Sequence, residues 1–143
     1  MKDAAPTARE QDRHRAVYAT PGLPGFKVDE VGDRLYAGRN PLTVVDAAEL
    51  SSRGVTHVLD LREDHEWRGP DRFGAEAVEE LGKRGVERHN LVVADLSPPT
   101  SPVLGAAATW IEEVLARPGT KVFVHCRAGR ERTGSALAAY FVA

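Results

Sequence analysis

The stretch Val122-Phe-Val-His-Cys-Arg-Ala-Gly-Arg-Glu-Arg-Thr-Gly134 decides how the rest of this sequence is interpreted. Its first three residues form a short apolar run of the kind found in a buried strand. His125 and Cys126 follow, and Cys126 is the only cysteine of the chain. The apolar run 136–141 then places its larger side chains at helical spacing. The stretch therefore predicts a strand, a tight loop and the first turn of a helix.

Such a loop is suited to binding and attacking a phosphate group. A loop that enters a helix N-terminus aims several backbone N–H groups at one point, and the helix dipole adds positive potential there. Gly129 lets the backbone turn and approach a ligand closely. Arg132 offers a planar fork to two phosphate oxygens. The same field favours the thiolate form of Cys126, which is the nucleophilic form.

The spacing His125-Cys126-x-x-Gly129-x-x-Arg132-Thr133 matches the signature H-C-x-x-G-x-x-R-[S/T] of the cysteine-dependent protein tyrosine and dual-specificity phosphatases. The segment 31–41 also resembles the opening hairpin of the bacterial dual-specificity-like branch. Rhodanese sulfurtransferases place a similar cysteine loop after a strand, but their loop is typically one residue shorter. A lone cysteine is most often a small buried hydrophobic residue. The matched residues around this one favour the phosphatase interpretation.

The resemblance implies a phosphocysteine mechanism that needs neither a metal nor a cofactor. It implies that Cys126 is the nucleophile and that Arg132 binds phosphate. Thr133 would help the thiolate to leave, and His125 would hydrogen-bond near the loop and support a low thiol pKa. Backbone N–H groups would bind the phosphate at Arg127, Ala128, Gly129, Arg130 and Glu131.

Asp95 is predicted to be the general acid and base. The departing alkoxide or phenoxide needs a proton, which a positioned carboxylic acid supplies before it activates the hydrolytic water. In the family this acid is usually an aspartate on a loop before the cysteine, and Asp95 lies 31 positions before Cys126 (126 − 95). Asp95 could instead cap a turn. Glu131 stands where common family loops carry glycine or serine, and it could share the acid role.

The rest of the sequence alternates predicted strands and helices. Strands are expected over 26–31, 35–37, 55–61 and 86–93, with helices over 43–53, after an Asp71 cap, and from Pro102 onward. Gly54 and Gly85 are expected to end the first two helices. This alternation predicts an α/β fold with a mostly parallel central sheet flanked by helices. The resemblance implies a phosphatase-like fold, here with a shortened C-terminal flank.

The segment Asp60-Leu-Arg-Glu-Asp64 follows a predicted central strand. Ligands of open α/β sheets gather beyond the carboxyl ends of the strands. We therefore expect this segment to border the site.

The chain is predicted to consist of a mobile N-terminal arm over 1–20 and a phosphatase-like catalytic domain over 21–143. The arm is charged and lacks a clear apolar stripe, so a loosely docked helix is the alternative. A length of 143 residues, with 42% apolar and 28% charged residues, is ordinary for one globular domain. The apolar end 140–143 leaves open a homodimer through the C-terminal helix or partial exposure.

Composition excludes several other function classes. The net charge of -2 gives no reason to expect nucleic acid as a partner. No apolar run approaches the length of a membrane span, so membrane insertion is not expected. A single cysteine and the lack of an evident signal peptide predict the cytoplasm. The remaining histidines lack metal-ligand spacing, so no metal site is expected.

The sequence as a whole predicts a hydrolase of phosphate monoesters. The expected substrates are proteins that carry phosphotyrosine, phosphoserine or phosphothreonine. Phosphoinositides and other small phosphates are the first alternative. A non-catalytic phosphate-binding module is the second, suggested by Glu131 and the short C-terminus. A sulfurtransferase is disfavoured by the loop length.

Overall fold

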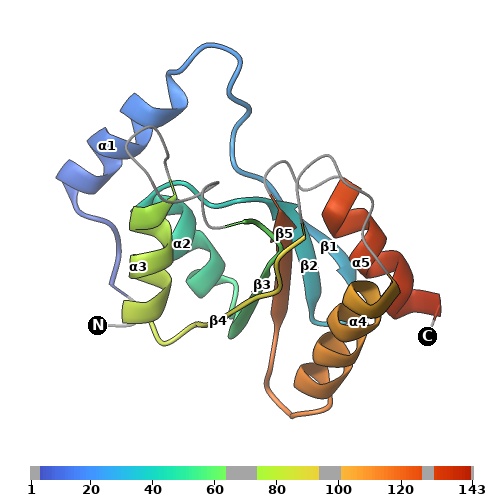
Figure 1. Ribbon diagram of the computed structural model, residues 1–143. Helices are drawn as coiled ribbons and strands as arrows, with labels where there is room; N and C mark the ends of the chain where they lie inside the picture. The colour runs from blue at the N-terminus through green and yellow to red at the C-terminus, as the bar shows by residue number, and fades with distance from the viewer. Residues whose placement is uncertain (1–3, 64–73, 94–100, 127–130, 143) are drawn as a thin grey trace.

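The computed structural model describes residues 4–63, 74–93, 101–126 and 131–142. The described part of the chain forms an alternating series of helices and strands (Figure 1). In chain order these are α1 (Ala8–Tyr18), β1 (Val28–Gly32), β2 (Leu35–Arg39), α2 (Val44–Ser52), β3 (His57–Asp60), α3 (Ala75–Lys83), β4 (Glu87–Asn90), α4 (Ser101–Leu115), β5 (Val122–Cys126) and α5 (Glu131–Val142).

The strands form one mixed sheet in the order β1-β2-β5-β3-β4. β1 and β2 pair antiparallel, and the pairs β2–β5, β5–β3 and β3–β4 are parallel. β5 is therefore the central strand, and every residue from Val122 to Cys126 is buried. A strand buried on both faces reads as a continuous apolar run. The predicted α/β fold with a mostly parallel sheet is confirmed.

The helices cover the two faces of the sheet and enclose two apolar cores (Figure 1). α4 and α5 lie over one face, where Ile111, Val114 and Ala136 pack against Val122 and Val124. α2 and α3 lie over the other face. The buried residues of that core are Val28, Tyr36, Ala47, Leu50, Val55, Val58, Leu81, Val86 and Phe123. Alternate residues of β5 thus enter opposite cores, which fixes the register of the central strand.

α1 lies outside α2 and α3 and is joined to them by polar contacts (Figure 1). The Tyr18 hydroxyl donates to the carboxylate of Asp46 in α2. Arg13 forms an ion pair of 3.0 Å with Glu76 in α3. The helix begins with a capping box between Thr7 and Glu10. The division of the chain into an arm and a domain at residue 20 stays a prediction.

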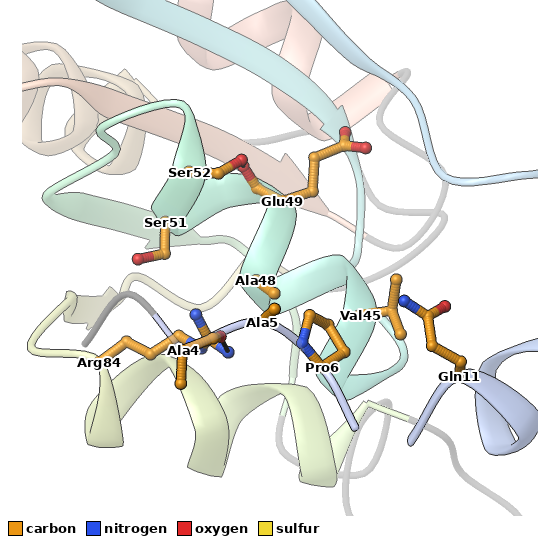
Figure 2. Close-up of a pocket in the computed structure, with 10 residues that line it drawn as sticks. All are labelled: Ala4, Ala5, Pro6, Gln11, Val45, Ala48, Glu49, Ser51, Ser52 and Arg84. Atoms are coloured by element: carbon orange, nitrogen blue, oxygen red, sulfur yellow. Dashed lines mark hydrogen bonds between the residues drawn. The ribbon is translucent and has the colours of Figure 1, made fainter. Parts of the chain in front are cut away.

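A hollow of about 420 Å³ lies between the N-terminal segment and α2 (Figure 2). Pro6 and Val45 line it, as does Arg84, whose Nη2 donates to the Ala4 carbonyl at 2.7 Å. The residues that line it include none of those predicted to act on phosphate. This hollow is therefore separate from the predicted phosphate-binding residues.

The predicted start of α3 is wrong. The helix begins at Ala75, so its N-cap is Gly74 and not Asp71, which lies outside the described residues. Gly74 has φ of +99°, and a Cβ atom there would lie 3.2 Å from Nη1 of Arg62. Glycine is therefore required by both its conformation and a close neighbour. Gly54 and Gly85 do end α2 and α3, with φ of +84° and +77°.

Candidate active site

Cys126 is the last residue of the central strand, at the edge of the sheet where the parallel strands end. It is 3% exposed and packs in the core cluster that contains Leu61 and Val93. The parallel register places His125 opposite Asp60 of β3. Central strands that end at one edge bring their last residues together, which is where α/β proteins bind ligands.

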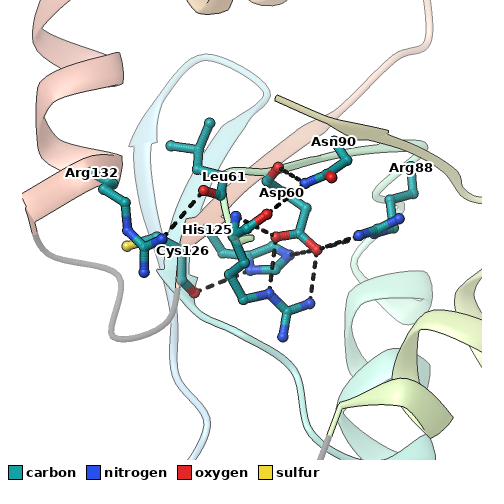
Figure 3. Close-up of polar contacts among 8 residues, drawn as sticks. Asp60, Leu61, Arg88, Asn90, His125, Cys126 and Arg132 are labelled. Atoms are coloured by element: carbon teal, nitrogen blue, oxygen red, sulfur yellow. Dashed lines mark hydrogen bonds and ion pairs between the residues drawn. The ribbon is translucent and has the colours of Figure 1, made fainter. Parts of the chain in front are cut away.

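Arg132 reaches the same place from the first turn of α5. Its side chain is buried, and the residue is 5% exposed. Its Nη1 donates to the carbonyl of Val93 at 2.9 Å and to that of Leu61 at 3.4 Å. Leu61 and Val93 belong to the same buried cluster as Cys126, so the guanidinium and the thiol lie at the same edge of the sheet. Figure 3 shows both side chains beside the end of β5.

Thr133 follows Arg132 in α5 and is 1% exposed. Its Oγ1 is buried and has no hydrogen-bond partner among the residues that the structure describes. A buried hydroxyl without a partner costs about 1–3 kcal/mol. A bound oxyanion or a thiolate would supply the missing acceptor.

His125 is buried and uncharged at neutral pH. Burial lowers the pKa of its imidazole to about 4, although the Asp60 carboxylate acts to raise it. Nδ1 lies 3.2 Å from the Cys126 carbonyl oxygen. A carbonyl only accepts hydrogen bonds, so Nδ1 carries the proton. This contact agrees with the position expected for His125, and its effect on the thiol stays a prediction.

Behind His125 lies a buried polar cluster built on the carboxylate of Asp60 (Figure 3). Arg62 donates to Asp60 through Nε at 2.9 Å and Nη2 at 2.8 Å, and Arg88 donates through Nε at 3.0 Å. Nε2 of His125 lies 3.9 Å from Oδ2 of Asp60. Asp60 and Arg62 are both fully buried. Two guanidinium groups therefore hold one carboxylate at the carboxyl end of β3.

The turn after Asp60 borders the site, as the sequence predicted. Arg88 and Asn90 in β4 were not singled out by the sequence. The pattern that could have identified them is the period of two in β4, where these half-buried polar residues alternate with the exposed Glu87 and His89.

Several predicted site residues lie outside the described residues: Asp95, Arg127, Ala128, Gly129 and Arg130. Glu131 is the first residue of α5, and its side chain is not described. Their predicted roles stay predictions.

Within the described part of the chain, no three or more histidine, cysteine, aspartate or glutamate side chains are grouped as they would be to hold a metal. The same residues contain no helix with the length and apolar character needed to cross a membrane.

Comparisons with known proteins agree with this geometry. A family model described as "Polymorphic toxin system, DSP-PTPase phosphatase" matches residues 31–143. Dual specificity protein phosphatase 26 of Homo sapiens is 36% identical over 116 residues, which are 80% of this chain and 50% of that protein. The chain thus spans about half the length of the curated relatives it matches.

Among the solved structures that share the fold are Tk-PTP and PTPMT1. Tk-PTP in its active form has a TM-score of 0.66 and 27% sequence identity, over 80% of this chain and 71% of that chain. PTPMT1 in complex with PI(5)P has the same TM-score, identity and coverage. α1 lies before the residues that the family model matches.

Proposed function

Because this chain belongs to the DSP-PTPase phosphatase family of polymorphic toxin systems, we propose that it hydrolyses phosphate monoesters through a phosphocysteine. The observation that carries the proposal is the buried guanidinium of Arg132, held by the carbonyls of Leu61 and Val93 where Cys126 ends the central strand. A buried cation at the end of a strand and the start of a helix is suited to a tetrahedral anion.

In the first step the Cys126 thiolate attacks phosphorus, and the bond between phosphorus and the ester oxygen breaks. Arg132 binds two of the equatorial oxygens and stabilises the charge that they carry in the transition state. Asp95 donates its proton to the leaving oxygen. The products of this step are the alcohol or phenol and a phosphocysteine.

In the second step Asp95, now ionised, takes a proton from water as the water attacks phosphorus. The bond between sulfur and phosphorus breaks, and inorganic phosphate and the thiolate are released. Thr133 Oγ1 would donate to the sulfur as it leaves, and the lack of a partner for this buried oxygen among the described residues supports that role. The N–H groups of residues 127–131 would hold the phosphate in both steps, and Glu131 could share the role of Asp95.

Phosphoproteins are the proposed substrates. The matched relatives are named dual specificity protein phosphatases. The structure of PTPMT1 with PI(5)P supports phosphoinositides as the second candidate. We also propose the cytoplasm as the location, because the sequence carries one cysteine.

Hydrolysis of p-nitrophenyl phosphate without added metal tests the proposal. Cys126→Ser should abolish turnover, and Arg132→Lys should lower it by at least tenfold because a lysine lacks the planar fork. Full activity of Cys126→Ser would overturn the proposal. Binding of inorganic phosphate by the wild-type chain without turnover would favour the non-catalytic module instead. A release assay on phosphopeptides and phosphoinositides separates the two substrate classes.

A homodimer through the C-terminal helix also stays a proposal. Phe141 and Val142 are 56% and 86% exposed in α5. Exposed apolar side chains at one end of a helix are suited to pairing with a second copy. Sedimentation of the wild-type chain beside Phe141→Asp would test this, because only a dimer through α5 would dissociate in the variant.

A further inference from the structure

The turn Asp60-Leu61-Arg62 contacts both the strand that ends at the predicted nucleophile and the predicted phosphate-binding arginine. The Leu61 N–H donates to the His125 carbonyl at 2.9 Å, one residue before Cys126. The Leu61 carbonyl accepts from Arg132 on its other side. Leu61 therefore connects β5 to the guanidinium of Arg132 in α5 through its own backbone groups.

Two side chains hold the turn in place. The Asp60 carboxylate accepts from the Arg62 backbone N–H at 3.0 Å, which closes the turn locally. The Asn90 side chain spans the turn from β4, with Nδ2 donating to the Asp60 carbonyl at 2.7 Å and the Arg62 carbonyl at 3.0 Å (Figure 3). Both partners of Asn90 are carbonyls, so the orientation of its amide is unambiguous.

The residues that follow β4 supply the second carbonyl that binds Arg132. Leu91 N–H donates to the Asp60 carbonyl at 3.0 Å, and Val93 N–H donates to the Leu61 carbonyl at 3.1 Å. Val93 then offers its own carbonyl to Arg132 at 2.9 Å. Because the guanidinium is planar, two carbonyls that fix Nη1 also restrict the directions in which the other N–H groups point.

We propose that Asn90 and the Asp60 carboxylate are positioning residues for Arg132, which they orient toward phosphate by fixing the Leu61 and Val93 carbonyls. This inference rests on the proposed function, in which Arg132 binds phosphate. Neither side chain touches the substrate. Arg88 contributes by holding the Asp60 carboxylate from β4.

The test compares Asn90→Leu, which keeps the size of the side chain and removes its donors, with His89→Leu. His89 is the neighbouring residue of β4, and its ring stacks on Trp110 in α4. We expect Asn90→Leu to raise the dissociation constant for inorganic phosphate at least tenfold and to raise KM more than it lowers kcat. His89→Leu should leave phosphate affinity within twofold.

The binding measurement needs no turnover, so it separates this inference from the proposed function. If the wild type binds phosphate but does not turn over substrate, the catalytic proposal fails and the comparison of affinities still decides the role of Asn90. Unchanged phosphate affinity in folded Asn90→Leu would overturn the inference, even if its melting temperature falls. An equal loss in His89→Leu would also overturn it.

Asn90→Ser covers the case in which Asn90→Leu does not fold. The serine hydroxyl keeps one donor at a shorter reach, so an intermediate loss of phosphate affinity is expected. Wild-type affinity in Asn90→Ser would overturn the inference. Failure of both variants to fold would make Asn90 a residue of general stability and would overturn it too.

Discussion

Two buried aspartates are satisfied in different ways, and the difference separates the site from the periphery of the molecule. Asp60 is fully buried and Asp46 is 2% exposed. Asp60 is held by the guanidinium groups of Arg62 and Arg88. Asp46 accepts from the Tyr18 hydroxyl and the backbone N–H groups of Leu42 and Thr43, and no guanidinium donates to it among the hydrogen bonds of the described residues; His14 Nδ1 lies 3.7 Å from its Oδ1.

The partners determine what each carboxylate organises. Burial acts to raise the pKa of Asp60, but interactions with His125 and Arg62 outweigh it and hold that pKa below the usual range of an aspartate. Asp60 therefore stays ionised and ties β3, β4 and β5 together at the edge where Cys126 lies. Asp46 is the N3 residue of the capping box that Thr43 begins at α2, and it accepts from the Tyr18 hydroxyl, so it joins α1 to the body of the fold.

Asp60→Ala should have the largest effect on stability. The substitution leaves the buried guanidinium of Arg62 and the half-buried guanidinium of Arg88 without the carboxylate that faces them. Removing one partner of a buried ion pair costs about 3–5 kcal/mol. Urea denaturation followed by circular dichroism measures the change, with exposed Asp33→Ala as the control. A loss below about 1 kcal/mol would show that the cluster has a minor role in stability.

The pH dependence of stability should show the second effect, through His125. The pKa of the folded imidazole is lowered to about 4 from 6.5, so only the unfolded state gains a proton between these values. The contribution of His125 to stability is therefore fully present above pH 6.5 and is lost as the pH falls to 4. At about 1.4 kcal/mol for each pH unit, the loss is roughly 3 kcal/mol. Asp60, whose pKa is also lowered, adds its loss only below pH 3.8.

Denaturation curves at pH 7 and pH 4.5 for the wild type and His125→Gln test this sign. The variant should have a flatter dependence, because its side chain does not titrate. Some slope should remain, since burial also lowers the pKa of His57. A His125→Gln slope equal to that of the wild type would contradict the assignment.

Asp46→Ala should have a smaller effect than Asp60→Ala. The lost acceptor leaves the N–H groups of Leu42 and Thr43 and the hydroxyl of Tyr18 to find other partners. Loss of a helix cap costs about 0.5–2 kcal/mol, and a buried unsatisfied donor adds to this. We expect about 2 kcal/mol by the same urea measurement, with phosphate affinity unchanged. A loss equal to that of Asp60→Ala would remove the distinction between the two carboxylates.

The sequence predicted the surroundings of Asp46 better than those of Asp60. The capping box of Thr43 and Asp46 is contained in four consecutive residues, so the start of α2 could be predicted. Arg62 lies two residues after Asp60, but its other partners come from other strands: Arg88 from β4, 28 positions later, and His125 from β5. A local sequence pattern cannot predict contacts between residues so far apart in the chain.

The same reason explains the wrong start of α3 and the limits at the site. Gly74 is favoured because its backbone lies close to Arg62, which is distant in sequence. A capping rule that considers only the residues around Asp71 cannot predict this contact. Cys126 and Arg132 could be placed from their spacing because one strand and one helix carry both. Asn90 could not, because its importance depends on a turn that lies about thirty residues earlier.

Tyr18→Phe should have the smallest effect on stability, and this effect should be limited to α1. The substitution removes one hydroxyl donor and keeps the ring, which packs 4.6 Å from the His14 ring between centroids. Asp46 retains the N–H groups of Leu42 and Thr43, so it is not left unsatisfied. A single hydrogen bond contributes about 1 kcal/mol. Hydrogen exchange should therefore speed up in α1 and stay unchanged in β3 and β5. Faster exchange in β5 would show that α1 and the site are coupled, and would end the separation between the two aspartates.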